Sequence, residues 1–131
     1  MSIFKNYSAE IFILLFFSIT YFLSVFEKIA DWKGTVAYYK SHFEKTILKN
    51  IIPLLLIKVI IFEIITVILL TIGLYYLVTE ESVLIAKIGL EISALTLLLF
   101  LVGQRLAKDY QGAMNITVYF ILNIIGIYLL T

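Results

Sequence analysis

The feature that most constrains this chain is a series of four apolar stretches, each about long enough to cross a lipid bilayer. They occupy residues 8–26, 51–77, 82–102 and 113–131. A helix needs about 20 residues, at about 1.5 Å each, to cross a hydrocarbon core of about 30 Å. The runs are continuously apolar, whereas the strands of a membrane barrel alternate apolar and polar residues. We therefore predict an all-α integral membrane protein, a single domain over residues 1–131 with four transmembrane helices in a bundle.

Composition agrees with this class and excludes several kinds of chemistry. Hydrophobic residues make up 63% of the chain and charged residues 15%, against roughly 45–50% and about 25% in soluble domains. The chain has no cysteine and a single histidine, His42. These counts exclude thiol chemistry, cysteine-bound metals and any two-histidine site within one chain. We predict no metal site and no catalysis by this chain alone. The net charge of +1 shows no basic excess, so we expect no nucleic-acid partner, whereas the apolar composition predicts contact with the lipid bilayer.

The basic residues are distributed unevenly between the two sides of the predicted membrane domain. The connections 27–50 and 103–112 share one side and carry seven Lys or Arg residues, against Lys5 and Lys87 on the other. Cytoplasmic connections are enriched in Lys and Arg. The asymmetry predicts that both termini lie outside the cytoplasm. The alternative places the two basic connections outside.

The first connection contains one apolar stripe at helical spacing. Trp32, Val36, Tyr39, Phe43 and Ile47 recur every three or four residues, with the lysines mainly elsewhere around the helix. This pattern predicts an interfacial amphipathic helix between spans one and two, beginning after Gly34, with Trp32, Tyr39 and Phe43 toward the bilayer. The alternative is a docking surface for a partner protein, for which the candidate residues are Lys28, Trp32, Tyr39 and Phe43.

Three charged residues lie well inside the predicted spans: Lys58, Glu63 and Glu91. Each costs about 2.5–3.5 kcal/mol at a helix centre unless something compensates it. Spans two and three are joined by a short turn, so they should be antiparallel neighbours. The two glutamates are then expected at similar depth near mid-membrane, with at least one protonated. Lys58 is placed to reach Glu63 obliquely or to extend its ammonium toward the membrane surface.

Span four adds Asn123 near its middle, where an amide usually makes a hydrogen bond between helices. Three interpretations of these polar residues stay open. They form a charge-compensated tie between helices, a site for a polar ligand head such as a quinone carbonyl or a lipid, or a proton path. The proton path is the weakest of the three, since two acidic groups without further relay residues could carry a proton over only a short distance.

The second connection, from Gly103 to Ala113, is the most distinctive polar segment. Glycines stand near both ends, and Arg105 and Asp109 are four residues apart, a spacing that suits an ion pair on one helix face. The pattern predicts a salt-bridged, one-turn helix. The candidate motif residues on this connection are Gln104, Arg105, Lys108, Asp109 and Tyr110.

Several short motifs in this sequence resemble those of a known family. They are Phe26-Glu27-Lys28 after span one, Phe62-Glu63 followed by Gly73-Leu74, and above all Gly103-Gln-Arg-Leu-Ala-Lys-Asp-Tyr-Gln-Gly-Ala113. Together with the four spans they resemble the DoxX family of small bacterial membrane proteins over nearly the whole chain. The resemblance implies a four-helix bundle in the bacterial inner membrane.

The DoxX resemblance implies a range of functions. Some relatives are small subunits of thiosulfate:quinone oxidoreductases, others belong to redox-stress complexes, and distant ones are cargo receptors or assembly chaperones. The resemblance therefore implies a non-catalytic membrane subunit or accessory of a quinone-linked redox or oxidative-stress system. Quinone or lipid would be its ligand, and other membrane or redox proteins, or a second copy, its partners. The alternative is a membrane adaptor or assembly and cargo factor for membrane or exported proteins.

Overall fold

The computed structural model describes the backbone of residues 2–131 and the side chains from Asn6 onward, and it is an all-α bundle over that range. Its helices are α1 (Ser2–Ala30), α2 (Trp32–His42), α3 (Ile52–Glu80), α4 (Leu84–Leu106) and α5 (Tyr110–Leu130). All but α2 are long and apolar enough to cross a membrane, which confirms the four predicted spans. Several helices extend beyond the predicted stretches, because an apolar run marks the lipid-crossing segment and not the helix ends.

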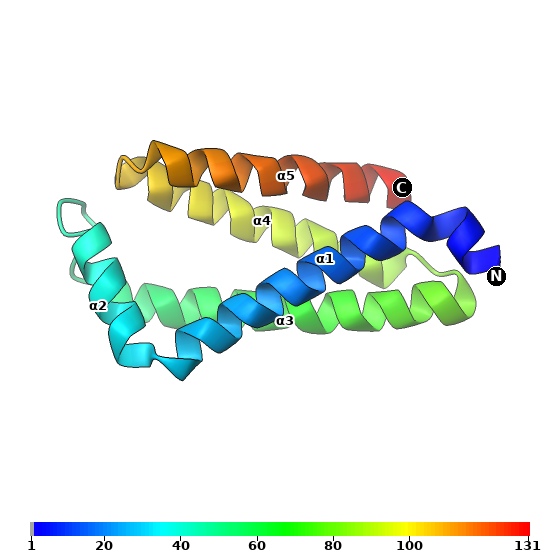
Figure 1. The fold of residues 1–131 in the computed structure, drawn as a ribbon, viewed down its shortest axis with the longest axis horizontal. Coiled ribbons are helices and arrows are strands. Elements are labelled where there is room, and N and C mark those ends of the chain that lie inside the picture. The colour runs from blue at the N-terminus through cyan, green and yellow to red at the C-terminus, as the bar shows by residue number, and fades with distance from the viewer. Residues whose placement is uncertain (1) are drawn as a thin grey trace.

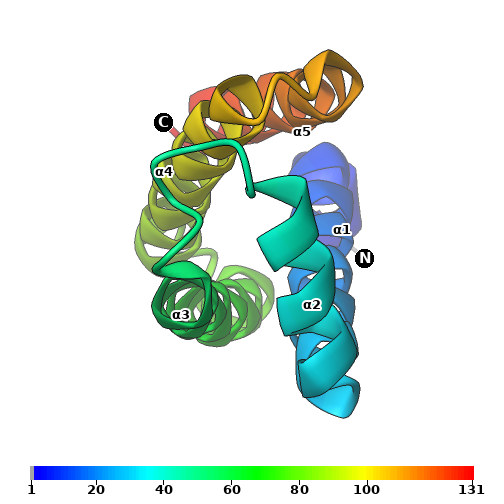
Figure 2. The same cartoon turned by 90° about the vertical axis from the view of Figure 1, so that its left-hand side faces the viewer.

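The four long helices follow one another around the bundle in the order α1, α3, α4, α5 (Figure 1, Figure 2). α3 packs against α4, α4 against α5, and α1 against α3, whereas α1 and α5 share a much smaller contact. That contact involves the first half of α1: the Phe16 and Tyr119 ring centroids are 5.9 Å apart. Farther along, α1 leans away from α5 and crosses α3 toward α2 (Figure 1).

The core of the bundle combines large aliphatic side chains with one very close approach of two backbones. Leu14, Phe17, Leu70 and Leu90 are fully buried. At Gly73, a Cβ would lie only 2.5 Å from the Ala86 backbone N and Cα atoms. α3 and α4 therefore touch through their backbones, which fixes the depth at which they are paired.

α2 lies across one end of the bundle, roughly perpendicular to the long helices (Figure 1). Its N-cap is Asp31, whose side chain accepts a hydrogen bond from the Gly34 N–H at 3.1 Å. This cap explains why the helix begins at Trp32 and not after Gly34 as predicted. α2 ends at His42, so the predicted stripe does not continue helically to Ile47, which is 85% exposed. No residue of α2 is buried.

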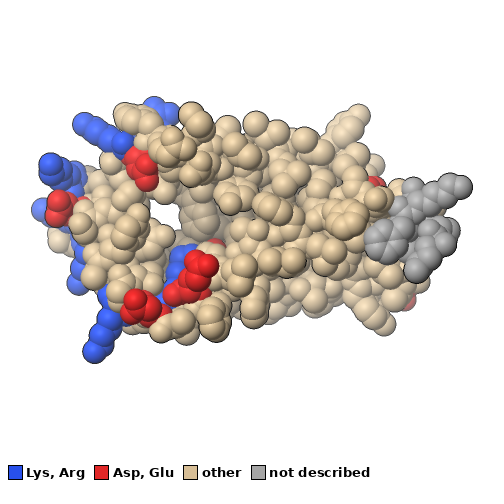
Figure 3. All heavy atoms as spheres, viewed as in Figure 1, with Lys and Arg blue, Asp and Glu red and all other residues tan. Residues whose placement is uncertain are grey.

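Charged side chains are concentrated at the end that carries α2. Figure 3 shows Lys and Arg gathered there and a largely uncharged midsection, while both chain ends lie at the opposite end (Figure 1). The two basic connections therefore do share one side, as the sequence predicts. The same view shows an opening through the molecule next to α2 (Figure 3).

Candidate functional site

An ion pair between α1 and α3 lies at the centre of the candidate site. Lys28 Nζ is 2.9 Å from Glu63 Oε1, and the two side chains are 12% and 1% exposed. Lys28 is in the last turn of α1, whereas Glu63 is about 17 Å along α3 from its start, at helical rise. The lean of α1 across α3 brings the two together, and Lys28 also donates to Ser24 Oγ. The charge of Glu63 is thus compensated inside the bundle.

The predicted cluster of Glu63, Glu91 and Lys58 does not form. Lys58 and Glu91 are both exposed on the outer faces of their helices. Lys58 is five residues from Glu63, about 140° around the helix, so it points outward when Glu63 points inward. Of these two glutamates only Glu63 is buried, whereas Glu91 is exposed, so the expected juxtaposition of two carboxyl groups inside the bundle is wrong.

A second polar cluster joins three helices in the middle of the bundle. Tyr21 Oη on α1 is 2.8 Å from Ser93 Oγ on α4, and Asn123 Nδ2 on α5 donates to the same Ser93 oxygen at 2.6 Å. All three side chains are almost completely buried. Asn123 therefore makes the kind of interhelical hydrogen bond expected of an amide in a span. Its Oδ1 atom has no partner among the described residues.

Removing the shared serine hydroxyl should destabilise the bundle. Ser93→Ala leaves the Tyr21 hydroxyl and the Asn123 amide without their common partner, and we expect a loss of about 1–2 kcal/mol in unfolding free energy. Thr96→Val is the matched control, because among the described residues the Thr96 hydroxyl bonds only within its own helix, to the Ile92 carbonyl at 2.9 Å. Reversible unfolding in mixed micelles measures both. Equal stability of Ser93→Ala and the parent would show that the cluster adds nothing.

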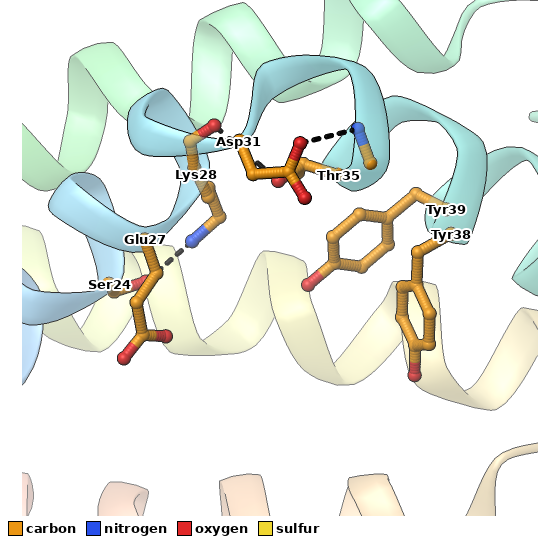
Figure 4. A pocket seen from close by; sticks show the side chains of 8 residues that line it. Ser24, Glu27, Lys28, Asp31, Thr35, Tyr38 and Tyr39 are labelled. Carbon is orange, nitrogen blue, oxygen red and sulfur yellow. Dashed lines mark hydrogen bonds between the residues drawn. The ribbon is translucent and has the colours of Figure 1, made fainter.

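A crevice of about 330 Å³ lies beside the ion pair, where α1 meets α2. It is lined by Ser24, Glu27, Lys28, Asp31, Gly34, Thr35, Tyr38 and Tyr39. Figure 4 shows the Tyr38 and Tyr39 hydroxyls and the Glu27 carboxylate pointing to the same open side, while the Lys28 ammonium turns toward Ser24. The crevice therefore presents hydroxyl groups to its opening and keeps its lysine turned inward.

The electrostatics of the crevice favour a protonated Tyr39. Burial, followed by the nearby Tyr38, Glu63 and Glu27 groups, raises the pKa of Tyr39 above its ordinary value. Its hydroxyl remains a hydrogen-bond donor over a wide pH range. The Asp31 carboxylate is engaged in capping α2, and Lys28 is neutralised by Glu63. The exposed Glu27 carboxylate at the opening disfavours an anion, so the arrangement suits a neutral polar group that accepts hydrogen bonds.

The second basic connection docks the end of α2. His42 Nε2 is 2.9 Å from Gln104 Oε1 and 3.5 Å from Asp109 Oδ2. Phe43 packs over Gly103, where a Cβ would lie 3.6 Å from its ring. Asp109 also caps α5 by accepting from the Gly112 N–H at 2.9 Å. The distinctive polar segment thus holds α2 in place over the bundle.

The internal structure of this segment differs from the prediction. Residues up to Leu106 belong to α4, so no separate one-turn helix forms. Arg105 lies over the ring of Tyr110, 5.5 Å from its centroid, while Asp109 binds Gly112 and His42. Lys108 is exposed and adopts the left-handed backbone conformation with φ of 59°. The predicted Arg105–Asp109 ion pair is therefore replaced by a helix cap and a histidine contact.

Sequence reasoning singled out some of these residues and missed others. Trp32, Tyr39 and Phe43 are half-buried on α2 or at its end, and Lys28 is an ion-pair partner instead of an exposed docking residue.

Four residues of the two polar clusters and the α2 contact were not predicted: His42, Tyr21, Ser24 and Ser93. The spacing of Tyr21, Ser24 and Lys28 along one face of α1 was the available signal, since it continues the apolar positions Leu14 and Phe17.

No protein-family model, curated protein or solved structure matches this chain.

Proposed function

We propose that this chain is a non-catalytic membrane subunit or accessory of a quinone-linked redox or oxidative-stress system in a bacterial inner membrane. Its crevice between α1 and α2 would hold the quinone head. The observation that carries the proposal is the set of hydroxyl groups on a crevice of about 330 Å³, directly beside the neutralised Lys28–Glu63 pair. The motifs that resemble the DoxX family support the same conclusion.

The chemistry of the crevice fits a quinone head. Such a head is a flat neutral ring whose carbonyl oxygens accept hydrogen bonds, so its site needs donors and aromatic surface. Tyr38 and Tyr39 supply both, and Tyr39 keeps its proton. Because Glu63 compensates Lys28, the head would not face an unpaired buried charge. A bound quinone would carry the electrons, and the residues of this chain would bind and orient it.

The surroundings of the crevice suit the isoprenoid tail of a quinone. The crevice lies at the end of a predicted span, where α1 has leaned away from α5 (Figure 1). Phe22 and Phe26, one turn apart on the outer face of α1, are 59% and 62% exposed. This apolar face would let a tail continue from the crevice into the lipid.

Quinone retention tests the proposal. Protein purified from quinone-containing membranes in mild detergent should yield bound quinone on extraction. Tyr39→Phe keeps the ring and removes one donor, so we expect roughly fivefold weaker binding, equivalent to about 1 kcal/mol. Tyr75→Phe is the control, since Tyr75 is an exposed tyrosine in the last turns of α3, outside the crevice. Absence of quinone together with a specific membrane or exported partner would favour the adaptor function.

We also propose that both chain ends lie outside the cytoplasm. Support comes from the concentration of Lys and Arg at the opposite end, where α2 lies (Figure 3). A reporter that is active only in the cytoplasm should give no signal when it is fused after Thr131, and a strong signal when it is inserted in the 43–51 loop. The reverse pattern would invert the orientation.

A further inference from the structure

A second groove lies on the other flank of α2. It is lined by Trp32, Lys33, Val36, Ala37 and Lys40 and has a volume of about 310 Å³. The helical periodicity places these residues on a different side of α2 from Asp31, Thr35 and Tyr38, which line the crevice between α1 and α2. The two grooves share no residue, so an inference about the second does not depend on the proposed function.

The charges of this groove are positive and unpaired. Lys33 and Lys40 are both exposed, and they stand seven residues apart, about 10.5 Å along the helix. Within the described part of the chain, neither forms an ion pair, and no carboxylate lines the groove. Val36 and Ala37 lie between the lysines and give the groove an apolar floor.

α2 connects two candidate membrane spans, so the groove is expected at the depth of lipid headgroups. α2 follows the span Asn6–Ala30 and precedes the span Ile52–Glu80, and it runs across the end of the bundle (Figure 1). Tryptophan at this depth is typical of the membrane interface, and Trp32 is half-buried at one end of the groove. The end of the molecule that bears α2 also carries most of its basic side chains (Figure 3).

We propose that this groove binds the headgroup of one anionic phospholipid. The lipid phosphate would lie between the ammonium groups of Lys33 and Lys40, and the glycerol region would rest on Val36 and Ala37. Lysines near a membrane surface attract anionic lipids, and two lysines on either side of an apolar floor recognise both parts of such a molecule. The charge complementarity favours an anionic lipid over a zwitterionic one, whose own ammonium group the lysines repel.

Lipid retention by matched charge variants tests this site. The protein is exchanged into a mixture of phosphatidylglycerol and phosphatidylcholine, and native mass spectrometry counts the lipids it keeps. Lys33→Gln/Lys40→Gln should lower the preference for phosphatidylglycerol by about 25-fold, since each lysine contributes roughly fivefold. Lys45→Gln/Lys49→Gln removes the same charge from the exposed loop at the same end and should lower the preference much less, because these lysines do not line the groove.

Three results would overturn the site. The first is an unchanged preference in Lys33→Gln/Lys40→Gln, and the second is an equal loss in both double variants, which would indicate general attraction. The third is displacement of the lipid by millimolar inorganic phosphate, which would show a site for free phosphate. Single Lys33→Gln and Lys40→Gln variants repeat the test if the double variant does not fold. Quinone retention should be unchanged in all of these lysine variants.

Discussion

Glu63→Leu should destabilise the bundle by about 3 kcal/mol. The variant leaves Lys28, only 12% exposed, without its partner, and an unpaired buried charge is strongly destabilising. Glu63→Gln should lose less, because its amide oxygen still accepts a hydrogen bond from Lys28. Unfolding in mixed micelles, followed by circular dichroism, gives the free energies.

Two controls separate the ion pair from other effects of this change. Glu91→Leu removes an exposed glutamate from the outer face of α4, so it should leave stability unchanged or raise it. Lys28→Met/Glu63→Leu removes both charges and should recover most of the loss, since apolar pairs often replace buried ion pairs without penalty. If Glu63→Leu were as stable as the parent, or the double variant no better than Glu63→Leu, the ion pair would not contribute to stability.

Gly73→Ala should lower the free energy of unfolding by about 2–3 kcal/mol, because it disrupts the contact of α3 with α4. The added Cβ would lie 2.5 Å from two backbone atoms of Ala86, and backbone cannot rotate aside as a side chain can. The two helices must separate, and the packing around Leu70 and Leu90 would loosen with them. Thermal melts in detergent should show a clear decrease in the midpoint.

Gly103→Ala is the matched control for the helix contact. Its Cβ would lie 3.6 Å from the Phe43 ring, an ordinary contact distance. We expect stability close to that of the parent. Equal melting temperatures for Gly73→Ala and Gly103→Ala would contradict the close backbone approach of α3 and α4.

The fold was largely predictable because its signals are local. Span length and continuous hydrophobicity depend only on neighbouring residues, and they located all four long helices. The ends of α2 were harder to predict. Its start depends on the Asp31 cap, and the apolar stripe was extended to Ile47 although the helix ends at His42. The basic end was predictable from the lysines in the connections, which lie together in the structure (Figure 3).

The site was only partly predictable because it depends on how the helices cross. Glu63 and Asn123 were singled out by their polarity, and both are buried. Their partners are 35 and 30 residues away, Lys28 for Glu63 and Ser93 for Asn123. Helical periodicity fixes which residues share a face, but the angle at which α1 crosses α3 selects Lys28 over Lys58. No spacing in the sequence encodes that angle.

The placement of a quinone head between α1 and α2 is tested most directly by photolabelling. The protein in lipid nanodiscs is irradiated with an azidoquinone, digested, and mapped by mass spectrometry. We predict adducts on the peptides that contain residues 24–39, reduced by excess unlabelled quinone and reduced in Tyr39→Phe. Labelling that is spread over the outer faces of α4 and α5 and is unaffected by unlabelled quinone would contradict a quinone site in this crevice.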